Sequence, residues 1–171
     1  MNIDIRDVVE RRSRFLIDEI RSGFPRYDHA VRFTLRSLSN YIHVGDDLGS
    51  HGIARGLRFR SRSAHDALLR LIADGAGKSR SWGSVLRNEH PDPLKAIWDR
   101  LQALPPDELS SDEVVRQLQA WPMVLVTIDE HKALDKKLPP FDRYREARVE
   151  VLTGDPTSAD GWCAAPQFVM R

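Results

Sequence analysis

Met123-Val124-Leu125-Val126-Thr127-Ile128 is the stretch that decides the fold of this chain. Its β-branched and aliphatic residues favour an extended strand. The run is apolar at odd and at even positions, so both faces of the strand need cover. We therefore predict a small sheet centred on residues 123–128, with this strand in its interior.

The segments around this strand extend the prediction. Residues 129–135 are expected to form a short helix, and residues 149–152 (Val-Glu-Val-Leu) a second strand. This strand-helix-strand order allows a small parallel pair. Upstream, residues 57–62 (Leu-Arg-Phe-Arg-Ser-Arg) alternate with a period of two, which predicts a further short strand.

The N-terminal half has helical periodicity. Apolar residues recur at helical spacing, and the Gly-rich segment 44–56 is expected to be a loop. The predicted helices cover residues 3–22, 27–42, 63–74, a segment starting at Asp92, and 110–119. The predicted fold class is α+β and mainly helical, with a helical N-terminal half.

The expected domain organisation is a single domain over residues 1–152. Its two lobes would be a helical one at 1–77 and a mixed α/β one at 84–152, joined by a polar connector. Residues 153–171 are rich in Gly, Pro, Ala and Ser and are expected to form a loose tail, which Trp162, Phe168 and Val169 could dock.

Composition limits the classes of function. The 171 residues carry a formal net charge of +1, so no overall field draws the chain to nucleic acid or to a membrane. Cys163 is the single cysteine, and no apolar stretch approaches the length of a transmembrane helix. The N-terminus does not resemble a signal peptide, so we expect a cytoplasmic protein. Arg outnumbers Lys by 21 to 5, which is typical of a GC-rich bacterial coding bias.

Two Glu-His dipeptides, Glu89-His90 and Glu130-His131, are the main candidates for chemistry. Each places a carboxylate beside an imidazole, and the second follows the predicted core strand directly. The arrangement resembles the HNH, or ββα-metal, nucleases. The resemblance implies a divalent metal, His90 as the general base, and Glu89 and His131 as metal ligands. Glu89 is also a candidate catalytic residue beside His90, and Glu130 a further candidate metal ligand. The middle Asn or His of that family is absent between His90 and His131.

A purely structural interpretation competes with this one. Glu130 stands three residues after Thr127, and this spacing predicts a capping box at the start of the helix. The box alone would account for Glu130. His131 would then be an ordinary first-turn residue.

A basic stretch lies between Gly52 and Arg87, with eight positive residues against two negative ones. Alternation places Arg58, Arg60 and Arg62 on one face of the predicted strand, about 6–7 Å apart, a spacing suited to backbone phosphates. The candidate contacts to nucleic acid or to an acidic protein partner are Arg55, Arg58, Arg60, Arg62, Arg80 and Arg87. The alternative is a solvated basic edge strand that discourages association between sheet edges.

Two functions follow from these features. The first is a binding or regulatory module that contacts nucleic acid or an acidic protein partner through the basic face at 55–87, as in bacterial phage-defence or anti-defence systems. The second is a small metal-dependent, HNH-like nuclease or phosphodiesterase that uses His90 and His131. The sequence leaves the oligomeric state open.

Overall fold

The computed structural model describes residues 4–23, 25–45, 49–75 and 81–168. It confirms the α+β class, with 57% of the chain helical, a helical N-terminal region and a five-stranded mixed sheet. The chain divides into two compact units, each made of two separate stretches. We call residues 1–47 with 92–121 the helical unit, and residues 48–91 with 122–171 the sheet unit. Neither unit coincides with the continuous lobes expected at 1–77 and 84–152.

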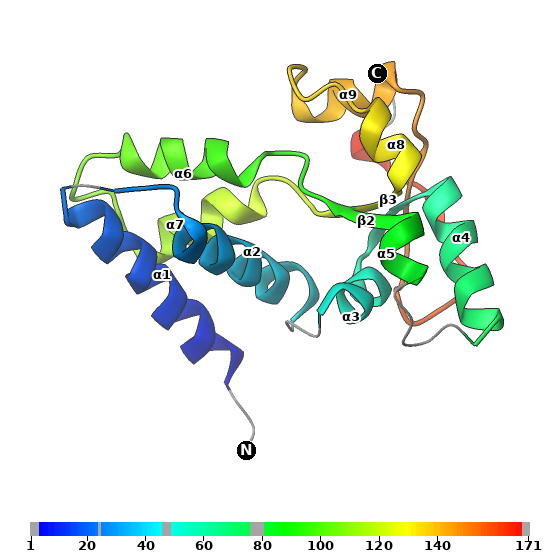
Figure 1. Cartoon of the computed structure of the whole chain (residues 1–171), viewed down its shortest axis with the longest axis horizontal. Helices are drawn as coiled ribbons and strands as arrows, with labels where there is room; N and C mark the ends of the chain where they lie inside the picture. Colours follow the sequence, from blue (N-terminus) through cyan, green and yellow to red (C-terminus); the bar gives the residue numbers. More distant parts are fainter. Residues whose placement is uncertain (1–3, 24, 46–48, 76–80, 169–171) are drawn as a thin grey trace. The chain divides into compact units, whose positions relative to one another are not determined.

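The helical unit consists of four described helices (Figure 1). They are α1 (Ile5–Arg21), α2 (His29–Val44), α6 (Leu94–Gln102) and α7 (Ser111–Gln119). Side-chain caps define the starts of α1, α2 and α7, whereas α6 follows Pro93 without one. Asp28 accepts a hydrogen bond from the Val31 amide at 2.9 Å, and Ser110 accepts one from the Glu113 amide at 3.3 Å. Gly45 ends α2 in the left-handed conformation that glycine adopts most readily.

An apolar core holds these four helices together. Each helix contributes side chains at helical spacing, so one face of every helix is withdrawn from water. The central members of this core are Leu16, Leu35, Leu38, Trp98, Leu101, Val114 and Leu118. At the margin, Asp92 forms an ion pair with Arg100 of α6.

In the part of the sheet unit that the structure describes, five strands lie in the order β2-β3-β1-β4-β5. They are β1 (Phe59–Ser61), β2 (Leu86–Glu89), β3 (Val124–Thr127), β4 (Val151–Thr153) and β5 (Cys163–Ala164). Only β1 and β3 pair in parallel; the other neighbours are antiparallel. The helices of this unit are α3 (Gly49–Gly56), α4 (Arg62–Ala73), α5 (Ser81–Val85), α8 (Ile128–Ala133), α9 (Pro140–Glu146) and the 3₁₀ helix η1 (Pro166–Phe168).

The predicted core strand is confirmed as β3. Val124, Leu125 and Val126 are fully buried, and β3 lies inside the sheet between β2 and β1. The parallel pair expected between 123–128 and 149–152 is wrong, because β1 lies between β3 and β4. A local strand-helix-strand pattern cannot reveal that a strand from 65 residues upstream takes the neighbouring position.

Two local predictions in the sheet unit are also corrected. The loop expected at 44–56 contains α3, whose buried Ile53 and Ala54 pack this short helix onto the unit. The strand expected at 57–62 is limited to Phe59–Ser61. Ser61 ends it, because its hydroxyl accepts a hydrogen bond from the Ala64 amide at 3.0 Å and starts α4 at Arg62.

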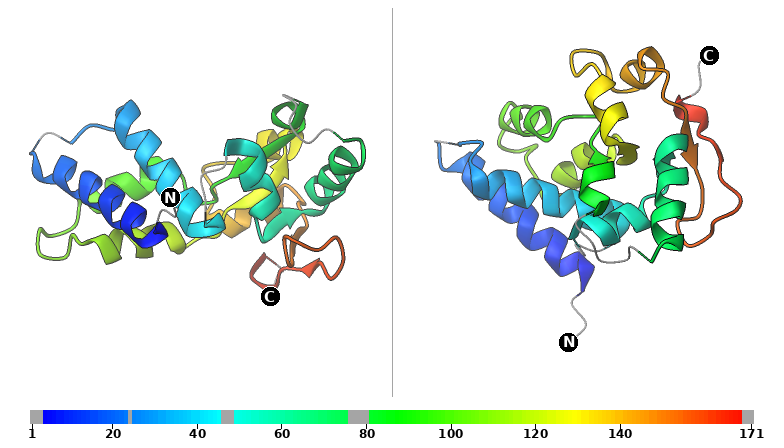
Figure 2. Two further views of the ribbon diagram at one scale, coloured as in Figure 1. Left: turned by 90° about the horizontal axis from the view of Figure 1, so that it is seen from below. Right: turned by 45° about the vertical axis from the view of Figure 1, so that its right-hand side comes forward.

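The segment after residue 152 is more ordered than expected. It forms β5 on the sheet edge and the 3₁₀ helix η1 (Figure 2). The centroid of the Phe168 ring of η1 lies 5.2 Å from that of Tyr144 and 6.0 Å from that of Phe59. Val169 lies outside the described residues. Trp162 packs against Gly154, where an added Cβ would stand 2.6 Å from the indole ring. These contacts make the C-terminal segment part of the sheet unit. Within the described residues, no helix is both long and apolar enough to cross a membrane.

Candidate functional site

Glu89 and His131 form a close pair in the sheet unit. Glu89 is the last residue of β2, and His131 lies in α8, which packs against β2. The His131 Nδ1 atom lies 2.7 Å from Glu89 Oε2. The Glu89 side chain is 8% exposed and that of His131 is 30% exposed. The geometry leaves the second ring nitrogen of His131, Nε2, on the side away from the carboxylate.

Arg143 and Tyr144 of α9 complete the surroundings of Glu89. The buried Arg143 places Nη1 3.7 Å from Glu89 Oε1 and donates a hydrogen bond from Nη2 to the Leu138 carbonyl at 3.1 Å. Burial raises the pKa of Glu89, while the charges of His131 and Arg143 oppose that rise. Burial and the nearby Glu89 charge hold the pKa of Tyr144 well above its usual value. The carboxylate is thus desolvated and paired with basic side chains.

Glu130 has a structural role that the sequence predicted. Its Oε2 atom accepts hydrogen bonds from the Thr127 amide at 2.8 Å and from the Ser61 hydroxyl at 2.5 Å. The Glu130 amide in turn donates to Thr127 Oγ1 at 3.2 Å, so the capping box is confirmed. Because Ser61 also caps α4, Glu130 connects the starts of two helices through the sheet.

The four residues of the two dipeptides do not gather around one point as a metal site would require. His131 contacts Glu89, Glu130 contacts Ser61 and Thr127, and His90 is half-buried just beyond β2. Among the residues that the structure describes, no group of three or more His, Cys, Asp or Glu side chains is placed to hold a metal ion. The contact between Glu89 and His131 is the part of the predicted site that forms.

The predicted arginine row does not form a single solvent-facing line. Arg60 is 2% exposed, and its Nη2 donates to the Arg55 carbonyl at 2.8 Å. Its guanidinium lies 4.1 Å from the centroid of the Trp162 ring, and burial lowers its pKa to about 10. Arg62 belongs to α4 and forms an ion pair with Glu150 at 2.6 Å. The edge-strand alternative is also wrong, because β1 is the middle strand of the sheet.

Of the other candidate contacts in the basic stretch between Gly52 and Arg87, Arg55, Arg58 and Arg87 are exposed. Arg58 precedes β1 and is exposed. Arg55 is exposed and holds its guanidinium 5.3 Å from the centroid of the buried Trp82 ring. Arg87 is exposed on β2 and donates to the Gly83 carbonyl. Arg80 lies outside the described residues.

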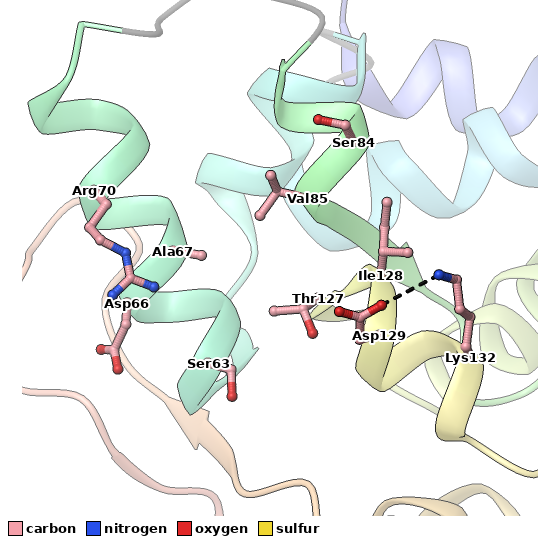
Figure 3. A pocket seen from close by; sticks show the side chains of 10 residues that line it. All are labelled: Ser63, Asp66, Ala67, Arg70, Ser84, Val85, Thr127, Ile128, Asp129 and Lys132. Carbon is pink, nitrogen blue, oxygen red and sulfur yellow. Dashed lines mark hydrogen bonds and ion pairs between the residues drawn. The ribbon is translucent and has the colours of Figure 1, made fainter.

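A polar cavity of about 590 Å³ lies in the same unit. Figure 3 shows Ser63, Asp66 and Arg70 of α4 on one side, and residues of α5 and α8 on the other. On the α8 side, Lys132 Nζ lies 3.4 Å from Asp129 Oδ1. The lining of this cavity carries two cationic side chains, Arg70 and Lys132, and two anionic ones, Asp66 and Asp129, so its formal charges balance.

Arg143 and Tyr144 are the members of the buried cluster that sequence reasoning missed. Arg143 is one of 21 arginines, and its local sequence, Phe-Asp-Arg-Tyr, indicates only a short helix. Its role depends on its contact with Glu89 of β2. The strand β2 pairs in turn with β3, which lies more than 30 residues later in the chain. No family model matches this chain, and comparison with curated proteins and with solved structures finds no significant match.

Proposed function

We propose that the sheet unit binds nucleic acid through exposed arginine side chains. The supporting observation is the division of charge between the two units. The sheet unit contains 15 Lys and Arg residues against 11 Asp and Glu, a formal charge of +4. The helical unit contains 11 against 14, a formal charge of −3. The near-neutral net charge of the whole chain is therefore the sum of a basic and an acidic unit. A polyanion is attracted to the basic one.

Arg58 and Arg87 are the side chains best suited to contact phosphates. Both are exposed, and Arg87 donates to the neutral backbone carbonyls of Gly83 and Leu86. Arg60, in contrast, is buried against Trp162, and the charge of Arg62 is paired with that of Glu150. An exposed guanidinium can approach a phosphate with two parallel hydrogen bonds. The proposed surface is therefore smaller than the row expected from the sequence.

Charge reversal on each unit tests this proposal. The Arg58→Glu/Arg87→Glu variant is compared with Arg32→Glu/Arg36→Glu, which changes two exposed arginines of α2 in the helical unit. Fluorescence anisotropy is measured with labelled single-stranded DNA, duplex DNA and RNA. We expect the sheet-unit variant to lose at least tenfold in affinity and the α2 variant to retain most of it.

Equal losses in the two variants, or no binding by the wild type, would contradict nucleic-acid binding by the sheet unit. An acidic protein partner is the competing occupant. It is supported if Arg58→Glu/Arg87→Glu abolishes capture of a partner by the immobilised full chain while no nucleic acid binds.

The Glu89–His131 pair favours a second candidate function, acid–base chemistry on a phosphodiester. A buried carboxylate lies 2.7 Å from Nδ1, and Nε2, the other ring nitrogen, can accept or donate a proton. The substrate would be the nucleic acid that the unit binds. In this account His131 is the catalytic residue and Glu89 positions it.

The test is cleavage of labelled DNA and RNA, with and without added divalent ions. His131→Gln should reduce any cleavage by at least a hundredfold. His29→Gln, an exposed histidine at the start of α2, is the matched control. Cleavage that persists in His131→Gln assigns the activity to another site or to a contaminant, and absence of cleavage by the wild type leaves the binding function alone.

A further inference from the structure

We propose that α1 and α2 of the helical unit dock an acidic amphipathic helix of a partner protein. Between these helices lies a cavity of about 600 Å³. From α1 it is lined by Val8, Arg11, Arg12 and Phe15, whose spacing of three and four residues places them on one helix face. From α2 it is lined by Phe33, Thr34 and Tyr41.

The groove is apolar and open to solvent. Phe33 is 57% exposed, although it is a large hydrophobic side chain on a well-formed helix. Ile5, three residues before Val8 and on the same face of α1, is 44% exposed. These are two of the three large hydrophobic side chains that are exposed among the described residues. An apolar surface concentrated at one groove is typical of a protein-binding site.

Arg12 gives the groove a defined charge. Its guanidinium carbon lies 5.9 Å from the centroid of the Phe33 ring and 5.3 Å from that of Tyr41. The two rings hold the guanidinium by cation–π interactions. Arg11 is a second cation of the lining, and the described lining residues include no carboxylate. The groove therefore complements a helix whose apolar side is flanked by Asp or Glu.

The same contacts favour a protein over a nucleic acid at this groove. Base stacking needs an open aromatic face, and Arg12 already occupies the space over Phe33 and Tyr41. Val8 in the lining and the exposed Ile5 beside it on α1 are aliphatic, so they cannot stack on a base or form a hydrogen bond with it. They can pack against leucine-like side chains. Aromatic residues and arginine are also the residue types that contribute most at protein interfaces.

The test uses the full chain and three labelled probes. The first is a helical peptide with Leu at every third and fourth position and Glu beside them. The second has Lys in place of each Glu, and the third is a single-stranded oligonucleotide. We expect the Glu peptide to bind at least tenfold more tightly than the Lys peptide. Phe33→Ser should weaken the Glu peptide at least tenfold, and Arg12→Glu should reverse the preference between the peptides.

Ile72→Ser is the matched control, because Ile72 is 42% exposed on α4 of the sheet unit. It should leave peptide binding unchanged. Thermal melts followed by circular dichroism verify that Phe33→Ser and Ile72→Ser remain folded, as expected for exposed positions. Equal affinity for the two peptides, no binding of either, or binding unaffected by Phe33→Ser overturns the proposal. An oligonucleotide whose binding is lost in Phe33→Ser but kept in Arg58→Glu/Arg87→Glu would reassign the groove to nucleic acid.

Discussion

The helical unit and the sheet unit are built on different principles. The helical unit buries apolar side chains and four uncharged polar ones, those of Ser13, Ser37, Ser39 and Asn40. Among its described residues, Asp92 is the buried ionisable one. The sheet unit buries Arg60, His65, Glu89 and Arg143 among its strands and helices. Buried charges cost desolvation free energy and are tolerated only when they are paired. The difference lies in charge: the helical unit is stabilised mainly by packing, whereas the sheet unit also depends on contacts of buried ionisable side chains that can support function.

Removing Arg143 should have the largest effect. Arg143→Leu leaves the buried Glu89 with His131 in contact and the Lys136 charge nearby, and breaking a buried pair in this way costs about 3–5 kcal/mol. Leu35→Ala in the helical unit creates a cavity instead, at a cost of about 2–5 kcal/mol. Urea unfolding followed by circular dichroism measures both.

The stability losses of Arg143→Leu and Leu35→Ala should respond differently to a second substitution, Glu89→Gln. Adding Glu89→Gln should restore part of the stability lost in Arg143→Leu, because it removes the poorly compensated charge. It should not restore Leu35→Ala. If adding Glu89→Gln restored the same unfolding free energy in both variants, the distinction between the units would be contradicted.

Gly154→Ala should have the next largest effect. The new methyl group would stand 2.6 Å from the Trp162 ring and would force it off the Arg60 guanidinium. Overpacking of this kind costs about 1–3 kcal/mol. Gly83→Ala on α5 is the control, since Gly83 has no positive φ and no atom lies within 4 Å of the added Cβ. Gly154→Ala should change the tryptophan fluorescence and lower the melting temperature more than the control variant does.

Loss of a helix cap should have a smaller effect, and a different one in each unit. Ser110→Ala removes one cap hydrogen bond in the helical unit, at a cost of about 1 kcal/mol. Thr127→Ala should cost more, because Glu130 would also lose a partner in the network that includes Ser61. Similar unfolding free energies for the two variants would show that this network adds nothing to the cap.

The smallest effects are those of pH, and their signs differ between the units. Glu89 of the sheet unit has a pKa raised above 4.5 by burial, so its contribution to stability is present below pH 4.5 and is lost as the pH rises through the folded-state pKa. Glu113 of the helical unit has a pKa lowered by hydrogen bonds from Arg116 and Gln117. Its contribution is present above pH 4.5 and is lost as the pH falls through the folded-state pKa.

Unfolding free energies of Glu89→Gln and Glu113→Gln between pH 3 and pH 8 test these signs. Relative to each variant, the wild type should gain stability toward low pH at Glu89 and toward high pH at Glu113. The same sign at both positions would contradict the assigned surroundings of Glu89.

Local features of the fold could be predicted from the sequence, and long-range ones could not. The strand at Val124–Thr127, the Thr127–Glu130 capping box and the main helices depend on neighbouring residues, and all three are confirmed. The pairing of β1 with β3 joins segments more than 60 residues apart. Hydrophobic periodicity contains no information about such a pairing.

The candidate site shows the same limit. Alternation correctly separates Phe59 from Arg60 in β1, but it does not say which face is covered. Trp162, about 100 residues later, covers Arg60 and removes it from the surface. Likewise, the contact of Glu89 with His131 could be suspected from the two Glu-His dipeptides, whereas Arg143 could be identified only once α9 was placed.

The dependence of nucleic-acid affinity on salt tests the central claim most directly. Each phosphate contact contributes about 0.9 to the slope of log affinity against log salt on duplex DNA, and about 0.7 on single strands. We expect Arg58→Glu/Arg87→Glu to reduce the slope by about 1.4–1.8, and Arg32→Glu/Arg36→Glu to leave it unchanged. An unchanged slope in the sheet-unit variant, or an equal reduction in both variants, would contradict binding of nucleic acid by the sheet unit.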